Sequence, residues 1–218
     1  MNVLIACEFS GVVRDAFRAR GHNAKSCDLL PSDSPHHIQG DVRMVIQNGW
    51  DLMIAHPPCT YLTCSAEWAY GDGPYHQKVK PRTLVGAERR EAREEAMHFF
   101  MLLYSCCIPK IAIENPVGVI ATRTYIKAAQ TFNPYDFGDD ASKRTCLWLK
   151  GLPPLAIDPA KRKAGRMVEW PRGSGKMVER WSNQTDSGQN NLSPSDDRWA
   201  ERSVTYQSIA NAMAEQWG

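Results

Sequence analysis

The stretch NVLIACEFSGVVRDAFRARGHNAKSCD, residues 2–28, sets the expected fold. It opens with a short apolar run over residues 2–7 that is typical of a buried strand. In the segment that follows, apolar residues recur at helical spacing, Ser10 can cap the helix, and Gly21 can end it. A second strand pattern then ends at Asp28. The stretch therefore predicts one strand–helix–strand unit.

The same alternation continues along the chain. Further strands are expected over residues 36–43, 51–55, 110–116 and 143–149. A long helix is expected over residues 84–107, with a charged, solvated front half and an apolar, buried back half. The closing segment TYQSIANAMAEQW places Ile209, Met213 and Trp217 in one helical stripe, which indicates packing on the core. Alternating strands and helices predict an α/β fold with a mostly parallel central sheet and helices on both faces.

The 218 residues suit one main domain with a small appendage. Residues 1–150 form the expected cofactor-binding and catalytic domain, and residues 198–218 are expected to complete it with a helix. Between them, residues 151–197 lose periodicity and become rich in Pro, Gly, Ser, Asn and charge. We expect that middle segment to be a small basic recognition or loop region.

The composition indicates the cellular compartment of the protein more clearly than its activity. The net charge of +2 identifies no partner, and the hydrophobic fraction of 43% is ordinary for a globular protein. No apolar run is long enough to span a bilayer, and the run after Met1 lacks a basic leader. Seven cysteines, an odd number, favour free thiols in a reducing, cytoplasmic compartment. Without a CxxC pair, no metal site is predicted.

The first strand-to-helix turn is the expected cofactor edge, since ligands of open parallel sheets bind beyond the carboxyl ends of the strands. This turn is Glu8-Phe9-Ser10-Gly11, in which Gly11 allows close backbone approach. A single glycine is not a G-x-G-x-x-G fingerprint, so a phosphate cradle is not expected. Asp28 is placed to accept from ribose hydroxyls and Asp41 from an exocyclic amine. Together these positions predict an adenosine-type ligand without phosphates.

The stretch DLMIAHPPCTYLTCS, residues 51–65, places a cysteine shortly after the end of a predicted strand. Pro57 and Pro58 fix the backbone there, so the thiol of Cys59 is held in place. A thiolate can add to an electron-poor carbon of a heteroaromatic ring if its surroundings lower its pKa. Cys64 is a second thiol that we interpret as structural. The remaining cysteines are interpreted as small apolar fillers: Cys7, Cys27, Cys106, Cys107 and Cys146.

Glu114 ends the strand KIAIENP, next to the strand that carries the thiol. Desolvation at the end of an apolar strand is expected to raise the pKa of this carboxyl group, so that it can donate a proton near neutrality. Cys59 and Glu114 are therefore expected to point into one cleft as nucleophile and acid.

At these residues the sequence resembles the DNA cytosine-C5 methyltransferase family. The resemblance rests on ACEFSG, on CD at Asp28, on GDV at Asp41, on PPC, on ENP, on KRTCLW and on SVTYQSIANAMA. It covers most of residues 1–150 and 199–217. The resemblance implies the Rossmann-like class I methyltransferase fold, S-adenosylmethionine as methyl donor and DNA as the partner.

The resemblance also implies roles for individual residues. Cys59 adds to carbon 6 of cytosine, Glu114 protonates or hydrogen-bonds ring nitrogen N3, and Arg144, with Lys143 as the second choice, contacts the substrate. The cofactor residues that it implies are Glu8, Phe9, Ser10, Gly11, Asp28, Leu29, Asp41, Val42, Pro57 and Ser203. The base in duplex DNA has to be flipped out for this chemistry.

Residues 161–180 carry seven basic and two acidic side chains, interleaved with Trp170 and Trp181. They are either a solvated basic loop or a phosphate-tracking surface with aromatic stacking. The loop over residues 70–82 is a weaker candidate for a lid over the substrate.

Other functions are compatible with the same residues. The region available for reading a target sequence is short, which leaves open RNA, a free nucleotide or a modified donor. A non-catalytic binding module with the methyltransferase fold is a further alternative. Methylation of an amino group is disfavoured, because the Asp/Asn-Pro-Pro-aromatic motif of such enzymes is replaced by His56-Pro57-Pro58-Cys59.

Overall fold

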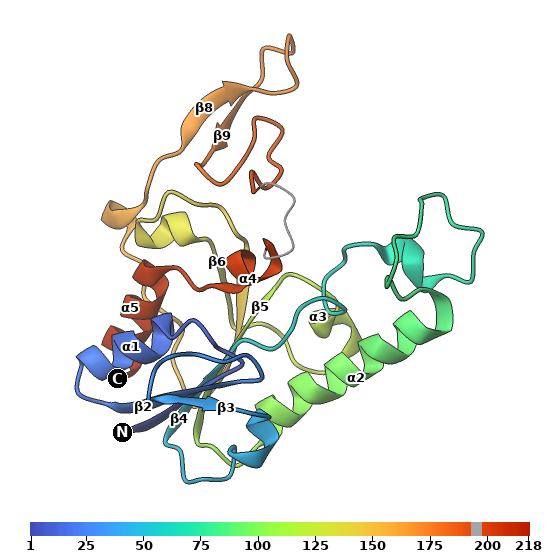
Figure 1. The fold of residues 1–218 in the computed structure, drawn as a ribbon. Helices are drawn as coiled ribbons and strands as arrows, with labels where there is room; N and C mark the ends of the chain where they lie inside the picture. The colour runs from blue at the N-terminus through green and yellow to red at the C-terminus, as the bar shows by residue number, and fades with distance from the viewer. Residues whose placement is uncertain (193–197) are drawn as a thin grey trace.

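The computed structural model describes residues 1–192 and 198–218. Its centre is a seven-stranded sheet of order β3-β2-β1-β4-β5-β7-β6 (Figure 1). The strands are β1 Asn2–Ala6, β2 Asn23–Asp28, β3 His37–Gln39, β4 Leu52–Ala55, β5 Lys110–Pro116, β6 Gln130–Phe132 and β7 Thr145–Lys150. The first five pair in parallel, whereas β7 runs antiparallel to both β5 and β6. The expected mostly parallel sheet is confirmed.

Helices cover both faces of this sheet. On one face, Val3 and Ile5 of β1 pack in one cluster with α1 (Val12–Ala19) and α5 (Gln207–Trp217). On the other face, Leu4 packs in a cluster with α2 (Gly86–Ser105). Alternate side chains of one strand thus reach two cores, as the pleat requires.

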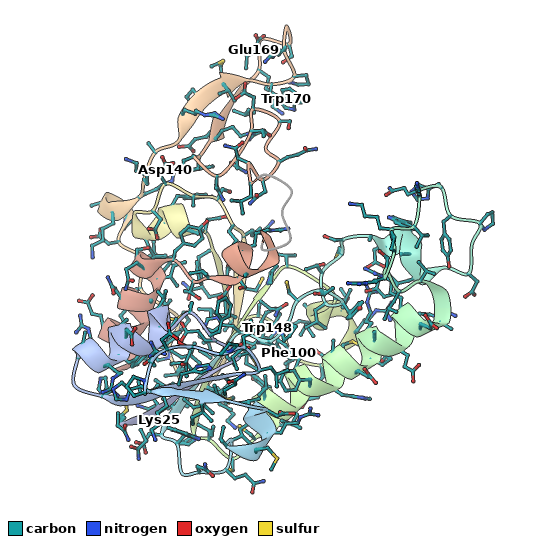
Figure 2. The ribbon with its side chains drawn as sticks, in the orientation of Figure 1. Lys25, Phe100, Asp140, Trp148, Glu169 and Trp170 are labelled. Atoms are coloured by element: carbon teal, nitrogen blue, oxygen red, sulfur yellow. The ribbon has the colours of Figure 1, made fainter. Side chains whose placement is uncertain are left out.

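Two labelled aromatic residues mark the α2 side of the core. Phe100 of α2 and Trp148 of β7 meet edge to face, with ring centroids 5.1 Å apart (Figure 2). On the opposite face, the predicted stripe of Ile209, Met213 and Trp217 is buried as expected.

The ends of α1 differ in part from expectation. Gly21, at φ 84°, follows the C-cap residue Arg20 and donates to the carbonyl of Arg18, as predicted for a terminating glycine. The residue at the N-cap is Gly11 and not Ser10, although the Ser10 hydroxyl accepts from the first helical amide, that of Val12, at 3.5 Å. The carboxylate of Glu8 accepts from the next two helical amides.

The front half of α2 is less solvated than predicted. Arg89 and Arg93 are both buried, and the Arg93 guanidinium lies 3.4 Å from the centre of the Tyr70 ring. Arg93 also bonds Glu67 at 2.6 Å and the Tyr61 carbonyl at 2.9 Å. These arginines therefore anchor the loop that follows Cys59 onto the helix.

The segment that lost periodicity contains an unpredicted hairpin. Strands β8 (Arg166–Glu169) and β9 (Met177–Arg180) pair antiparallel and project away from the main sheet (Figure 1). The last five residues of the predicted recognition region, 193–197, lie outside the described residues.

The remaining elements are short: η1 Val42–Met44, η2 Glu67–Tyr70, α3 Ile120–Arg123, η3 Pro134–Phe137, η4 Pro159–Lys161 and α4 Arg198–Ser203. Within residues 1–192 and 198–218, no helix has the length and apolar character that a membrane span requires.

Candidate active site

The register of two parallel strands creates the centre of the site. Ala55 of β4 pairs with Ile113 of β5, so the next residues, His56 just after β4 and Glu114 within β5, lie side by side. The Nδ1 of His56 lies 2.8 Å from Oε2 of Glu114. Both side chains are only 9% exposed, so the contact is made away from bulk water.

A lysine ammonium group reaches the same carboxylate. Lys143 precedes β7, which runs back along β5, and its Nζ lies 3.8 Å from Oε1 of Glu114. Burial would raise the pKa of Glu114, but Lys143 and His56 together outweigh burial and lower it to about 2. The prediction of a raised pKa and a free proton donor at Glu114 is therefore wrong. Both carboxylate oxygens face cationic or hydrogen-bonding groups, so Glu114 is an acceptor.

The backbone around Cys59 is held at several points. The Asn115 amide donates to the Pro57 carbonyl at 2.8 Å, which ties the Pro-Pro segment to the end of β5. The Cys59 carbonyl accepts from the backbone amides of Leu62 and Thr63 in a tight turn.

A close approach of backbones fixes the far side of this turn. Thr63 forms an isolated bridge with Gly118, and the Val119 amide donates to the Leu62 carbonyl at 2.8 Å. A Cβ on Gly118 would lie 1.9 Å from that same carbonyl oxygen. The expectation that the thiol is held in place is thus supported by contacts beyond the two prolines.

The thiol of Cys59 is not activated in the ligand-free protein. Burial raises its pKa, the positive charges of Lys143 and Arg202 oppose that rise, and the negative charge of Glu114 adds to it. Cys59 and Glu114 thus lie in one electrostatic environment, together with Lys143. The condition that the surroundings lower the thiol pKa is therefore not met by the residues around Cys59 in the ligand-free protein.

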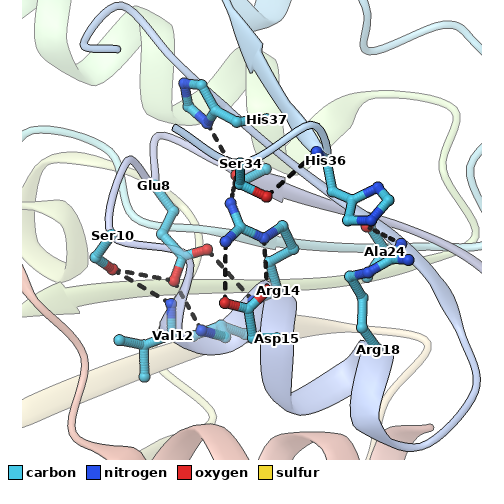
Figure 3. A network of polar contacts seen from close by, with 12 residues as sticks. Glu8, Ser10, Val12, Arg14, Asp15, Arg18, Ala24, Ser34, His36 and His37 are labelled. Atoms are coloured by element: carbon cyan, nitrogen blue, oxygen red, sulfur yellow. Dashed lines mark hydrogen bonds and ion pairs between the residues drawn. The ribbon is translucent and has the colours of Figure 1, made fainter. Parts of the chain in front are cut away.

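Glu8 takes a structural position at the predicted cofactor edge (Figure 3). Its carboxylate accepts from the Val13 amide at 2.8 Å, from the Arg14 amide at 3.4 Å and from the Ser10 hydroxyl at 3.3 Å. This carboxylate fills the helix N-terminus where a phosphate would otherwise bind.

Position 11 has room only for glycine, because the Arg14 side chain occupies the place of a Cβ. It adopts φ 78°, and a Cβ there would lie 2.1 Å from the Arg14 guanidinium. That guanidinium donates to Ser26 of β2 at 2.9 Å, and Ser26 in turn contacts His37 of β3. One polar network therefore runs from α1 through the middle of β2 to the start of β3.

Asp28 and Leu29 form the most accessible part of this edge. Asp28 accepts from the Leu30 amide at 2.9 Å through Oδ1, and Leu29 is 72% exposed. The carboxylate of Asp41 is instead covered by the Arg43 side chain, which forms a bidentate pair with it. Arg43 would therefore have to move before Asp41 could accept from a ligand.

The other predicted residues are more dispersed. Val42 is buried in the core, Pro57 is buried, and Phe9 is half-buried in the turn. Ser203 is exposed and donates to the Ala200 carbonyl within α4. Arg144 is exposed, so Lys143, the second choice from the sequence, is the residue that reaches Glu114.

The basic segment separates into paired and unpaired cations. Arg162 pairs with Glu179 at 2.6 Å, and Arg166 pairs with Asp186 at 3.1 Å. Within the described part of the chain, four basic side chains of this segment have no ion pair or hydrogen bond: Lys161, Lys163, Arg172 and Lys176.

The stacking role predicted for Trp181 is wrong. Its ring is 7% exposed and stacks on Tyr135 at 4.0 Å and 10°. Its indole nitrogen donates to the Lys163 carbonyl at 3.0 Å. Trp181 therefore anchors the hairpin segment to the main domain. Trp170, near the hairpin tip (Figure 2), is half-buried.

The sequence did not assign a role to His56. The available signal was its place directly after β4, one position beyond the paired residues of two parallel strands. The site combines a held thiol, a buried carboxylate and two groups that can carry positive charge, a set suited to addition of a nucleophile to a ring.

No protein-family model matches this chain, and no curated protein is significantly similar to it in sequence.

Proposed function

We propose that this protein is an S-adenosylmethionine-dependent methyltransferase that methylates carbon 5 of cytosine in DNA through a covalent Cys59 adduct. The observation that carries the proposal is the common environment of Cys59, Glu114 and Lys143 at the ends of β4, β5 and β7. A sheet in which β7 alone reverses between β5 and β6 is compatible with the class I methyltransferase fold.

The residues divide the chemistry between them. The Cys59 sulfur adds to carbon 6, which pushes electron density onto carbon 5 and ring nitrogen N3. Lys143 contributes positive charge beside the ring, and the Glu114 carboxylate accepts a hydrogen bond from N3 once that nitrogen has gained a proton from solvent. After carbon 5 takes the methyl group, loss of the carbon-5 proton to solvent expels the Cys59 thiolate, and release of the N3 proton to solvent restores the neutral ring.

The residues at the first three strand ends fit the cofactor. Glu8 occupies the helix N-terminus with its own negative charge, which disfavours a ligand that carries phosphates. Asp28 suits ribose hydroxyls, and the exposed Leu29 beside it offers an apolar surface for a base. When bound, S-adenosylmethionine supplies the electrophilic methyl group, and its positive charge favours the thiolate form of Cys59.

The projecting hairpin provides the proposed contact with DNA. The unpaired cations Arg172 and Lys176 lie in the turn between β8 and β9, where phosphates can reach them. Phosphate contacts of this kind give affinity and orientation with little sequence information. We therefore expect limited sequence specificity.

The test is methyl transfer from tritiated cofactor to mixed-sequence duplex DNA, followed by base analysis. We expect label in cytosine, loss of label in Cys59→Ser, and retained label in the matched control Cys64→Ser, since Cys64 is exposed. Label in adenine, or a preference for free nucleotides over duplex DNA, would overturn the proposal.

A further inference from the structure

The His56 ring has one satisfied and one unsatisfied nitrogen. Its Nδ1 contacts Glu114 at 2.8 Å, whereas its Nε2 is buried and has no hydrogen-bond partner among the described residues. An unpaired polar atom inside a protein carries a desolvation cost, so each such atom requires an explanation. The unpaired Nε2 belongs to His56, whose other ring nitrogen contacts Glu114 of the proposed active site.

The Glu114 contact determines which nitrogen carries the proton. A carboxylate has only acceptor oxygens, so Nδ1 has to be the donor in this contact. Lys143 already provides a positive charge to the same carboxylate, and Cys59 and Arg202 are the other titratable or charged groups of this environment. A second proton on Nε2 would be a buried donor without an acceptor. With the proton on Nδ1, Nε2 presents a bare lone pair that no described residue satisfies.

We infer that Nε2 of His56 recognises the exocyclic amino group of the target base, an inference that rests on the proposed function. The amino group of cytosine brings N–H donors to a buried acceptor that the protein leaves unpaired. Uracil and thymine present a carbonyl oxygen at the same position, and two acceptors would then face each other. A site built to pair one donor rejects analogues that lack it. His56 is thus a specificity residue for an aminopyrimidine.

The proton position can be measured on the ligand-free protein. Side-chain 15N NMR of the histidines should show His56 with its proton on Nδ1 above neutral pH. In Glu114→Ala the proton should move to Nε2, the tautomer that a free imidazole prefers. A wild-type His56 that carries its proton on Nε2 would overturn the inference, whether or not the protein methylates DNA.

The recognition itself is tested by covalent trapping. Duplexes that differ only in 5-fluorodeoxycytidine or 5-fluorodeoxyuridine at one position are incubated with cofactor, and the rates of adduct formation are compared. His56→Leu should lower the cytosine-to-uracil ratio by roughly tenfold or more, because one buried hydrogen bond is lost. His56→Gln, which keeps an acceptor, should retain most of the ratio.

His98→Leu is the matched control, since His98 is exposed on α2. A His56→Leu ratio equal to that of wild type and His98→Leu would overturn the inference while leaving the proposed function intact. A wild-type protein that forms no adduct with the cytosine duplex would instead overturn the proposed function, and with it the recognition of a base by His56.

Discussion

Lys143 places its ammonium nitrogen 3.8 Å from Oε1 of Glu114, the carboxylate oxygen that His56 does not contact. The lysine comes from the segment before β7 and the carboxylate from β5, so the antiparallel strand brings them together. Arg144, the next residue, is exposed. Of the two basic residues, Lys143 is therefore the one built into the proposed active site.

Replacing Lys143 should impair catalysis more than replacing Arg144. Lys143→Met removes the charge that lowers the pKa of both Glu114 and Cys59, so the pH optimum of methyl transfer should move upward. We expect kcat/KM to fall by roughly a hundredfold, the order found when one preorganised electrostatic group is removed. Arg144→Met should cost less, and Lys143→Arg should recover part of the loss. A larger effect at Arg144 would show that Lys143 is the wrong choice.

The Glu114 contacts should make stability depend on acid pH. The folded-state pKa of about 2 lies below the ordinary value of 4.5, so the carboxylate stabilises the fold above pH 4.5. This contribution is lost as the pH falls toward 2, because the unfolded state then binds the proton first. Urea unfolding should show a difference in unfolding free energy between wild type and Glu114→Gln that shrinks across this range. A constant difference would contradict the lowered pKa.

Gly118 should be needed for the position of the thiol. An alanine Cβ there would lie 1.9 Å from the Leu62 carbonyl oxygen and would push the Cys59 turn away from β5. We expect Gly118→Ala to lower both the free energy of unfolding and the rate of adduct formation at Cys59. Gly40→Ala is the matched control, since a Cβ at Gly40 meets no atom within 4 Å. Equal behaviour of the two variants would show that the close approach does not position the turn.

The hairpin cations should set the salt dependence of DNA binding. Arg172→Gln and Lys176→Gln should each reduce the slope of log affinity against log salt by up to about 0.9 if the residue contacts a phosphate. Lys25→Gln is the control, because Lys25 lies at the opposite end of the molecule from the hairpin tip (Figure 2). A slope that all three variants leave unchanged would place the DNA on another surface.

Strands of the main sheet could be predicted because buried strands consist mainly of apolar residues. The runs that became β1 and β4 are almost wholly apolar, and β5 contains the apolar run 111–113, as parallel strands with two covered faces require. The β8–β9 hairpin has no such apolar pattern, because its strands are not buried: Met167 and Met177 are both more than half exposed. Strand β6, with only three residues at the sheet edge, was too short for its pattern to be recognised.

The sequence was sufficient to predict which residues lie together in the candidate active site, but not the direction of the Glu114 pKa shift. Residues near the carboxyl ends of neighbouring parallel strands meet at one edge, which was sufficient to predict that Cys59 and Glu114 share one environment. The direction of the Glu114 pKa shift depends on Lys143, which is distant in sequence and arrives only through the antiparallel pairing of β7. The burial of Trp181 likewise depends on Tyr135, a partner that no local pattern indicates.

The most direct test of the central claim is peptide mass mapping of a trapped complex. Wild-type protein, cofactor and a duplex with 5-fluorodeoxycytidine should give a denaturant-stable adduct whose modified peptide carries the nucleotide on Cys59. Absence of an adduct, or attachment at Cys64 or another cysteine, would contradict the account.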